Sequence, residues 1–498
     1  MNNSPYDLFK KIEFGDPDGL YDKNISEYFI DNNYWGQLVE GRKFFVIGRK
    51  GTGKSAIYNW IKSQEAERNV LVSNLSFKDF PFERLLQLSD DDFYKPNQYQ
   101  SVWRNIILTE IAKLIILDEK ASIDDYYREL FSYVELKFGK DLIDLHKKVA
   151  KLTVKNEAGL FLKGSGLGTS SADERELCDD YSNVTNINRR LEQLISNYLK
   201  CNQTNPYIIQ FDQLDDIFTV YINNNDEYFQ SIISLFKVIY NINQAFYQTD
   251  IPVKVIGYLR SDIFYEINNY DAESARWDAH KLYLNWAIIN RSDWRYPPLL
   301  QMLDKRVLRS IPDLNLNGQD SAFRAIMKDI KISDRQGNEK NVFTYMIHKS
   351  FQRPRDLIQF CKKIQDHSLR VSHLNARCIT DSEKEYSVWL LTEVSNEFGP
   401  FIKQKPTLYD FLRNLGNRFI TYEEACQQYS KYEKPLGMSA DKLFDLLYRL
   451  GIIFNVNVNS GQTEYFSILR NEQSIFNQKL SICLHPGIMK GLHTYSNQ

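Results

Sequence analysis

The sequence predicts an α/β protein built around a mostly parallel β-sheet. Short apolar runs, typical of buried strands, alternate with longer amphipathic stretches between residues 44 and 284. One such run passes directly into a glycine-rich loop and then into a helical stretch that starts near Ala56. Because strands that alternate with helices form parallel sheets covered on both faces, we expect ligand-binding residues at the carboxyl ends of the strands.

Five apolar runs are expected to form the strands of this sheet. They are residues 44–47, 70–75, 207–211, 253–259 and 281–284. Helical spacing of apolar residues is expected at 103–115, 126–145, 187–199, 228–240, 299–311 and 341–364. The gap between the second and third runs is far longer than a simple β-α-β crossover of roughly 30 residues, so it must contain an inserted unit.

The first strand leads into the most informative stretch of the chain. This stretch reads Gly48-Arg49-Lys50-Gly51-Thr52-Gly53-Lys54-Ser55. It matches the phosphate-binding pattern G-x-x-x-x-G-K-[ST] at every fixed position, between a strand and a helix as that pattern requires. The residues expected to contact a nucleotide are Gly48, Gly51, Thr52, Gly53, Lys54, Ser55 and Ala56. Lys54 is expected to reach the β- and γ-phosphates, and Ser55 to ligate Mg²⁺, which makes ATP and Mg²⁺ the expected cofactors.

A set of acidic residues follows the strand at 207–211. Asp212 comes directly after this run, and Asp215 and Asp216 stand three and four positions after Asp212. A carboxylate at the tip of a buried strand beside a phosphate loop holds Mg²⁺ through water, so Asp212 joins Ser55 as an expected metal ligand. Asp215 or Asp216 is expected to polarise the attacking water, and the pattern does not decide between them. The alternative is an acidic turn after a core strand.

Two arginines are further candidates for contact with the γ-phosphate. Arg260 follows the strand at 253–259, and its alternative role is a structural ion pair with Asp262 or another acid. Arg355 follows Pro354, and proline favours the first turn of a helix. A helix that begins there would aim Arg355 from a lid, whereas Arg353 precedes the proline and is expected to matter less.

The C-terminal region from about residue 373 carries no catalytic pattern. A helix at 441–450 precedes two runs, 452–458 and 464–469, that are expected to form a hairpin around the turn at 459–461. Helices followed by a hairpin are similar to a winged helix. The helix carries acidic and basic residues in equal number (Asp441, Lys442, Asp445 and Arg449), which suits a protein contact better than DNA phosphates.

The composition excludes several classes of protein. The net charge of −2 gives no basic field for nucleic acid, and six scattered cysteines form no C-x-x-C pair, which argues against zinc and disulfides. The N-terminus lacks a signal-peptide core, and no apolar run approaches the roughly 18–20 residues of a membrane span. The sequence therefore predicts a cytoplasmic protein with no membrane contact.

Together these motifs resemble the bacterial P-loop ATPases of the AAA+/STAND group. Gly48–Ser55 is similar to the loop of a branch that reads G-R-K-G-[ST]-G-K-[ST], and residues 211–216 resemble the STAND Walker B motif, with Gln213 in place of glycine. Residues 258–262 resemble its sensor 1, and residues 353–357 the sensor 2 entry of origin-recognition-like ATPases. The resemblance also implies that Arg276 is an arginine finger, which contacts the nucleotide bound by a neighbouring copy of the protein. The alternative is a local ion pair of Arg276 with Asp271, Glu273 or Asp278.

The expected fold is thus a P-loop NTPase core with a helical insertion, a helical lid and a winged-helix-like C-terminal domain. The expected segments are an N-terminal part of the core (1–75), the insertion (76–181), the rest of the core (182–290), the lid (291–372) and the C-terminal domain (373–498).

Three functions remain open from the sequence. The first is a Mg²⁺-dependent ATPase that acts as a switch or assembly and regulates a partner or effector encoded nearby; the resemblance implies an antiphage defence setting for it, and a homo-oligomer is compatible with it. The second is an origin-recognition-like ATPase that loads or remodels DNA. The third is a nucleotide-binding scaffold with little turnover.

Overall fold

The computed structural model describes residues 4–493 except for 77–96, 98, 139–183, 203–204, 216–224, 271, 289–293, 317, 334–336, 400, 417, 460–461 and 472–473. The chain divides into two compact units. The first, the sheet unit, comprises Asp31–Arg49 and Ile57–Leu284. The second, the helical unit, comprises Met1–Ile30, Lys50–Ala56 and Asn285–Gln498. Within the described ranges, no helix is both long and apolar enough to cross a membrane.

The sheet unit is built on a five-stranded sheet in the order β2-β3-β4-β1-β5, and every pairing in it is parallel. Its strands are β1 (Phe45–Gly48), β2 (Leu71–Ser76), β3 (Tyr207–Asp212), β4 (Val253–Arg260) and β5 (Lys281–Tyr283). The prediction of an α/β fold with a parallel sheet is therefore confirmed, and each strand lies within about one residue of its predicted run.

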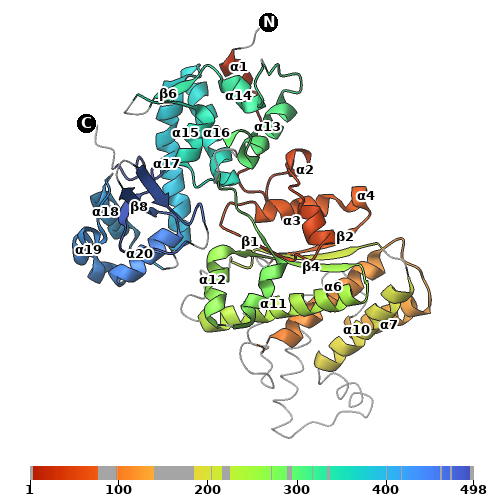
Figure 1. The fold of residues 1–498 in the computed structure, drawn as a ribbon. Coiled ribbons are helices and arrows are strands. Elements are labelled where there is room, and N and C mark those ends of the chain that lie inside the picture. Colours follow the sequence, from red (N-terminus) through yellow and green to blue (C-terminus); the bar gives the residue numbers. More distant parts are fainter. Residues whose placement is uncertain are drawn as a thin grey trace, which may run out of the picture. The chain divides into compact units, whose positions relative to one another are not determined.

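Helices lie on both faces of this sheet (Figure 1). One face is covered by α6 (Gln100–Leu117), α10 (Val184–Cys201), α11 (Asn225–Gln248) and α12 (Ser261–Tyr270), and α3 (Lys54–Ser63) lies on the other. The remaining helices are η1 (Gly36–Glu40), α4 (Glu65–Arg68), α7 (Asp125–Phe138) and η5 (Ala272–His280).

The alternation of side chains along β3 explains this arrangement. Tyr207, Ile209 and Phe211 enter the core that α6 and α11 share, whereas the Gln210 amide on the opposite face donates to the Tyr58 carbonyl of α3. Successive side chains of a strand point to opposite faces, so both faces of a central strand can be buried.

Helix α6 lies in the range 76–181 that the sequence assigns to an insertion, yet it shares the core of the sheet. Trp103 is fully buried, and its indole donates to the Ser231 carbonyl of α11 at 3.0 Å. The five segment boundaries stay predictions.

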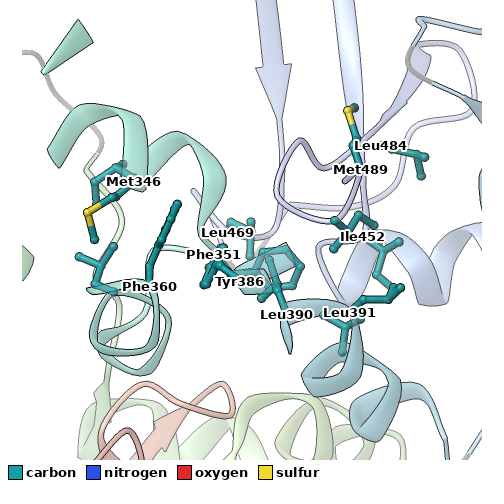
Figure 2. Close-up of a cluster of buried hydrophobic side chains, with 14 of the residues drawn as sticks. Met346, Phe351, Phe360, Tyr386, Leu390, Leu391, Ile452, Leu469, Leu484 and Met489 are labelled. Atoms are coloured by element: carbon teal, nitrogen blue, oxygen red, sulfur yellow. The ribbon is translucent and has the colours of Figure 1, made fainter. Parts of the chain in front are cut away.

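The helical unit has one continuous hydrophobic core. Its N-terminal and central elements are α1 (Pro5–Phe9), α2 (Ile25–Tyr28), α13 (Pro298–Ser310), α14 (Ala322–Met327), β6 (Lys331–Ser333), β7 (Glu339–Asn341), α15 (Val342–Lys349), α16 (Pro354–Val371) and α17 (Ala376–Phe398). Figure 2 shows the part of the core where Phe360 of α16 stacks on Tyr386 of α17, with ring centroids 4.1 Å apart.

The C-terminal part of this unit packs three helices with a small antiparallel sheet. The helices are α18 (Lys405–Leu415), α19 (Tyr422–Leu436) and α20 (Ala440–Arg449), and the strands are β8 (Ile453–Asn459), β9 (Gln462–Phe466) and β10 (Ser481–Leu484). The predicted hairpin strands are present as β8 and β9, and β10 pairs with the other side of β8. The sequence gives no signal for β10, because a strand of four residues is too short to show a period.

Candidate functional site

The glycine-rich loop joins β1, which ends at Gly48, to α3, which begins at Lys54. Two of its glycines adopt positive φ angles, +81° at Gly51 and +98° at Gly53, which side chains with a Cβ rarely tolerate. A Cβ on Gly51 would also lie only 3.1 Å from the Cβ of Arg355. Thr52 and Lys54 are buried, and Ser55 is half-buried. The glycines of the predicted motif therefore stand where this backbone path requires them.

Three successive carbonyl groups of this loop accept hydrogen bonds from residues between 286 and 355, which belong to the same helical unit. The Arg353 guanidinium donates to Lys50 at 2.9 Å, the Arg355 backbone N–H to Gly51 at 3.4 Å, and the Trp286 indole to Thr52 at 2.8 Å. In a trans peptide the C=O and N–H point in opposite directions. The N–H groups that follow these carbonyls, on residues 51–53, thus face away from the three donors, which is the polarity an anion-binding loop needs.

Arg353 is the central residue of this arrangement. Its side chain is fully buried, contacts both carboxylate oxygens of Asp356 at 2.9–3.1 Å and contacts Glu397 at 2.9 Å. Burial alone would lower the pKa of Arg353, but Asp356 and Glu397 raise it, so the guanidinium stays charged. The residue before the proline is extended (φ −113°, ψ 149°), as proline demands. Arg353 therefore supports the loop structurally, and the expectation that it matters less than Arg355 for the nucleotide stays a prediction.

Arg355 stands in the first turn of α16, as the sequence predicts, since Pro354 opens that helix. Its guanidinium donates to the Pro17 carbonyl at 3.2 Å and forms ion pairs with Asp18 at 3.2 Å and Glu393 at 3.3 Å. Glu393 also pairs with Lys50 of the loop at 3.4 Å. The Arg355 guanidinium is therefore paired with two carboxylates, those of Asp18 and Glu393.

The carboxyl ends of β3 and β4 bring together three of the predicted site residues in the sheet unit. Asp212 ends β3 and Arg260 ends β4, and both side chains are buried. Arg260 lies opposite Gly48 of β1 in the parallel register. Its guanidinium contacts the two Asp262 oxygens at 3.0 and 2.6 Å and Asp215 at 3.6 Å. The predicted ion pair with Asp262 therefore forms, and Asp215 is held by the same arginine.

Two tyrosines, Tyr58 and Tyr258, lie near Asp212 at the end of β3. Burial, and then the Asp212 charge, raise the pKa of both Tyr58 and Tyr258, so these hydroxyls stay protonated. The Tyr258 hydroxyl donates to Gln210, two residues before Asp212. Gln213, directly after Asp212, has φ +62°, and this left-handed residue turns the chain toward Asp215.

Two further predicted site residues, Arg276 and Asp216, lie outside the contacts described above. Arg276 lies in η5 with an exposed side chain. Asp216 lies outside the described residues, so the choice between Asp215 and Asp216 stays open.

Three residues that no sequence motif indicates also support the loop: Trp286, Glu393 and Glu397. Trp286 and Glu397 lie more than 200 residues from the loop in sequence and belong to no motif. A single sequence carries no signal for such long-range contacts, except that Arg353-Pro354-Arg355 marks the start of the helix that makes them.

Part of the chain matches a known family, and the chain is also similar to one curated protein. Residues 297–395, which include α13 to most of α17, match the model of a family described as the FunZ-associated C-terminal helical domain. Over 98% of its length the chain is also 21% identical to the "Putative transposon gamma-delta 80.3 kDa protein" of Escherichia coli strain K12, and the match covers 68% of that protein.

Proposed function

We propose that the protein is a Mg²⁺-dependent ATPase of the AAA+/STAND group, with a P-loop NTPase core, that acts as a nucleotide-controlled switch. The observation that carries this proposal is the conformation of the loop between β1 and α3. Gly51 and Gly53 take positive φ, and three carbonyls are bonded on the side away from the N–H groups of residues 51–53. Such a loop, at the N-terminus of a helix, favours phosphate.

The residues of the loop and of the strand ends have defined roles in this proposal. Lys54 binds the β- and γ-phosphates, Ser55 and Asp212 hold Mg²⁺, and Arg260 senses the γ-phosphate. Asp215 or Asp216 orients the attacking water. The burial of Asp212 and Arg260 at the ends of adjacent parallel strands supports these roles, because ligands of such sheets bind beyond the carboxyl ends.

The contacts of the loop inside the helical unit support the switch. Its carbonyls are bound by α16 and by Trp286, and Lys50 pairs with Glu393 of α17. When the loop closes on a phosphate, these contacts change, and α16 and α17 respond to the nucleotide. The helical unit then passes this change to a protein partner or effector, and a defence role is one setting for such a device.

A second candidate, a DNA-handling ATPase, has two observations in its favour. The relative from E. coli is named as a putative transposon protein, and three helices with a small antiparallel sheet compose a winged-helix-like end. Against duplex binding, Arg449 of α20 pairs with Asp445 of the same helix at 2.7 Å, which neutralises it. We therefore prefer a protein contact for this domain.

The decisive experiment measures ATP binding and hydrolysis by purified wild-type and Lys54→Ala protein, with and without Mg²⁺ and with and without DNA. We expect Lys54→Ala to lose most of its ATP affinity while its thermal unfolding is unchanged. A folded Lys54→Ala protein that binds ATP as the wild type does would refute the site. Turnover stimulated by DNA and weakened steeply by salt would favour the second candidate.

A further inference from the structure

A segment of turns follows strand β10 in the helical unit, and we call residues 485–492 the tail segment. The backbone N–H of His485 donates to the Ile452 carbonyl at 2.9 Å, which extends the pairing of β10 with β8 by one bond. Ile488 and Leu492 are fully buried. The tail segment is therefore part of the core of this unit, although it contributes no residue to the sites discussed above.

The backbone of the tail segment lies directly against α15 and α17 at two glycines. A Cβ on Gly487 would come within 2.1 Å of the Lys349 carbonyl oxygen at the end of α15. A Cβ on Gly491 would come within 2.7 Å of the Ser387 carbonyl oxygen of α17. The Gly491 N–H also donates to the Ser387 hydroxyl at 2.7 Å. Glycine is the residue that allows two backbones to approach this closely.

A buried carboxylate joins the same three parts of the chain. Glu383 of α17 is fully buried, and it pairs with Lys349 of α15 at 2.9 Å and with Lys490 of the tail segment at 2.7 Å. Lys490 also donates to the Thr380 carbonyl at 2.8 Å. Burial alone would raise the pKa of Glu383, but the charges of Lys349 and then Lys490 lower it, so the carboxylate stays ionised. The tail segment is thus fixed to α15 and α17 by charge as well as by close packing.

A chain of direct contacts leads from the tail segment to the glycine-rich loop. The His485 ring meets Phe351 edge to face, with ring centroids 4.5 Å apart. The Arg353 guanidinium lies over the same Phe351 ring, 5.1 Å from its centroid, and donates to the Lys50 carbonyl of the loop at 2.9 Å. Figure 2 shows Phe351 in one buried cluster with Met489 of the tail segment. The surroundings of Phe351 therefore include the tail segment on one side and Arg353 on the other.

Phe351 is also tied to the carboxylate that holds Arg353. The Phe351 N–H donates to Asp356 at 2.9 Å, and the Arg353 guanidinium donates to the same carboxyl group at 2.9 Å. A displacement of Phe351 would therefore disturb the Arg353–Asp356 pair. Because protein interiors are close-packed and transmit strain, this disturbance would reach the bond from Arg353 to the Lys50 carbonyl.

We propose that the tail segment positions the phosphate loop for ATP, and that His485 and Phe351 are the positioning residues through which it acts. This inference rests on the proposed function, since it requires that the loop binds ATP. The contacts hold the Lys50 carbonyl on the side away from the N–H groups of residues 51–53, so a displaced tail segment leaves the loop less preorganised for phosphate.

The consequence is a defined route of regulation. A protein partner that displaces the tail segment lowers the affinity of the loop for ATP. Coupling between two sites is reciprocal, so bound ATP in turn holds the tail segment against α17 by the same factor.

The test measures the affinity of purified full-length variants for a non-hydrolysable ATP analogue by calorimetry. His485→Asn keeps an acceptor for the Gly487 N–H, which bonds to His485 Nδ1 at 2.9 Å, but it removes the ring from Phe351. Phe351→Leu removes the other ring, and Lys490→Met loosens the tail segment at a half-buried lysine. We expect each variant to weaken binding at least about fivefold, the lower end of typical couplings between sites. In the Phe351→Leu background, His485→Asn should add no more than about twofold, because both changes break one contact.

Two controls and a second measurement separate positioning from general stability. Leu443→Ala empties a fully buried position of α20, and Lys442→Met removes an exposed charge beside it. Both residues lie outside the chain of contacts, so both variants should bind the analogue within about twofold of the wild type. Hydrogen exchange of the Gly491 N–H reports the docking of the tail segment on Ser387. The analogue should slow this exchange in the wild type and leave it unchanged in Lys54→Ala.

Three results would overturn the proposal. One is normal binding of the analogue by His485→Asn, Phe351→Leu and Lys490→Met. Another is an equal loss of affinity in Leu443→Ala, which would make the effect one of stability. The third is a Gly491 exchange rate in the wild type that the analogue does not change. In each case the wild type still binds the analogue through Lys54, so the proposed ATPase stands. A wild type that binds no nucleotide refutes the proposed function, and this inference with it.

Discussion

The guanidinium of Arg353 donates a hydrogen bond to the backbone carbonyl of Lys50, 303 residues earlier in the chain, at 2.9 Å. The same side chain is buried between the carboxylates of Asp356 and Glu397. Arg353 thus connects the glycine-rich loop to α16 and α17. The carboxylates of Asp356 and Glu397 compensate its positive charge. This contact makes Arg353 a structural support of the loop.

We predict that Arg353→Met destabilises the protein by about 3–5 kcal/mol, because it leaves two buried carboxylates without their cation. The measurement is the free energy of unfolding in urea at neutral pH. Arg377→Ala is the control: this arginine pairs with Asp381 on the surface at 3.6 Å, and its loss is expected to cost less than about 1 kcal/mol. Equal effects of the two substitutions would refute the supporting role of Arg353.

Arg355→Ala is expected to slow ATP hydrolysis and to reduce the ATP-dependent change in the helical unit. The stability should fall by no more than about 1 kcal/mol, since the side chain makes partly exposed ion pairs and its backbone N–H to Gly51 is retained. Hydrogen exchange of residues 350–370, with and without a non-hydrolysable ATP analogue, measures the response. Equal protection in both states, with wild-type turnover in the variant, would exclude Arg355 as a sensor.

Asp212→Ala is expected to weaken both Mg²⁺-dependent ATP binding and turnover. Asp215→Asn or Asp216→Asn should keep binding and lower the turnover rate by about 10²–10⁴-fold, because a positioned base contributes that much. Steady-state and single-turnover kinetics separate the two effects. If neither neutralisation slows hydrolysis, the role in water activation is wrong.

Asp215 needs a specific control, because it contacts Arg260. Asp262→Asn removes the other carboxylate that holds this arginine and leaves Asp215 in place. If Asp262→Asn slows turnover as much as Asp215→Asn, Asp215 acts by orienting Arg260. A clear effect of Asp215→Asn alone supports a direct role.

Arg276 provides a test of assembly. If its exposed side chain completes the site of a neighbouring copy, Arg276→Ala and Lys54→Ala proteins are each inactive but regain part of the ATPase activity when mixed. A trans arginine acts on the transition state, so ATP binding by Arg276→Ala should be normal. Strictly monomeric sedimentation with and without ATP would exclude this role and leave Arg276 with a local ion pair.

Lys254 of β4 predicts a pH dependence of stability. Burial, and then the charge of Arg42, lower the pKa of Lys254 from 10.5 to about 8. Between pH 8 and 10.5 the unfolded state binds more protons at this residue, so its contribution to stability rises with pH across that window.

Lys254→Met should therefore stabilise the protein at pH 7 by up to about 3 kcal/mol, less about 1 kcal/mol for the lost hydrogen bond to the Gly41 carbonyl. This gain should disappear above pH 10.5. Urea unfolding at both pH values measures it, with Lys331→Met on the exposed face of β6 as the control. A Lys254→Met effect that is the same at both pH values would contradict the lowered pKa.

The amino-acid sequence by itself determined the parallel sheet, its five strands and the loop between the first strand and its helix. These features depend on local patterns: apolar runs of strand length, glycines before a lysine, and a proline at the start of a helix. Asp212 and Arg260 could be assigned to one edge of the sheet from the sequence, since the carboxyl ends of parallel strands lie together.

Only the tertiary structure decided which groups hold that loop. The pairing of Arg353 with Asp356 spans three residues, but its contacts with Glu397 and Lys50 join distant segments, and so does the bond from Trp286 to Thr52. The short strand β10 likewise depends on its pairing with β8, which forms only after folding. Periodicity reports the environment of one element, whereas a buried ion pair depends on how several elements pack, and a single sequence does not encode that packing in any local pattern.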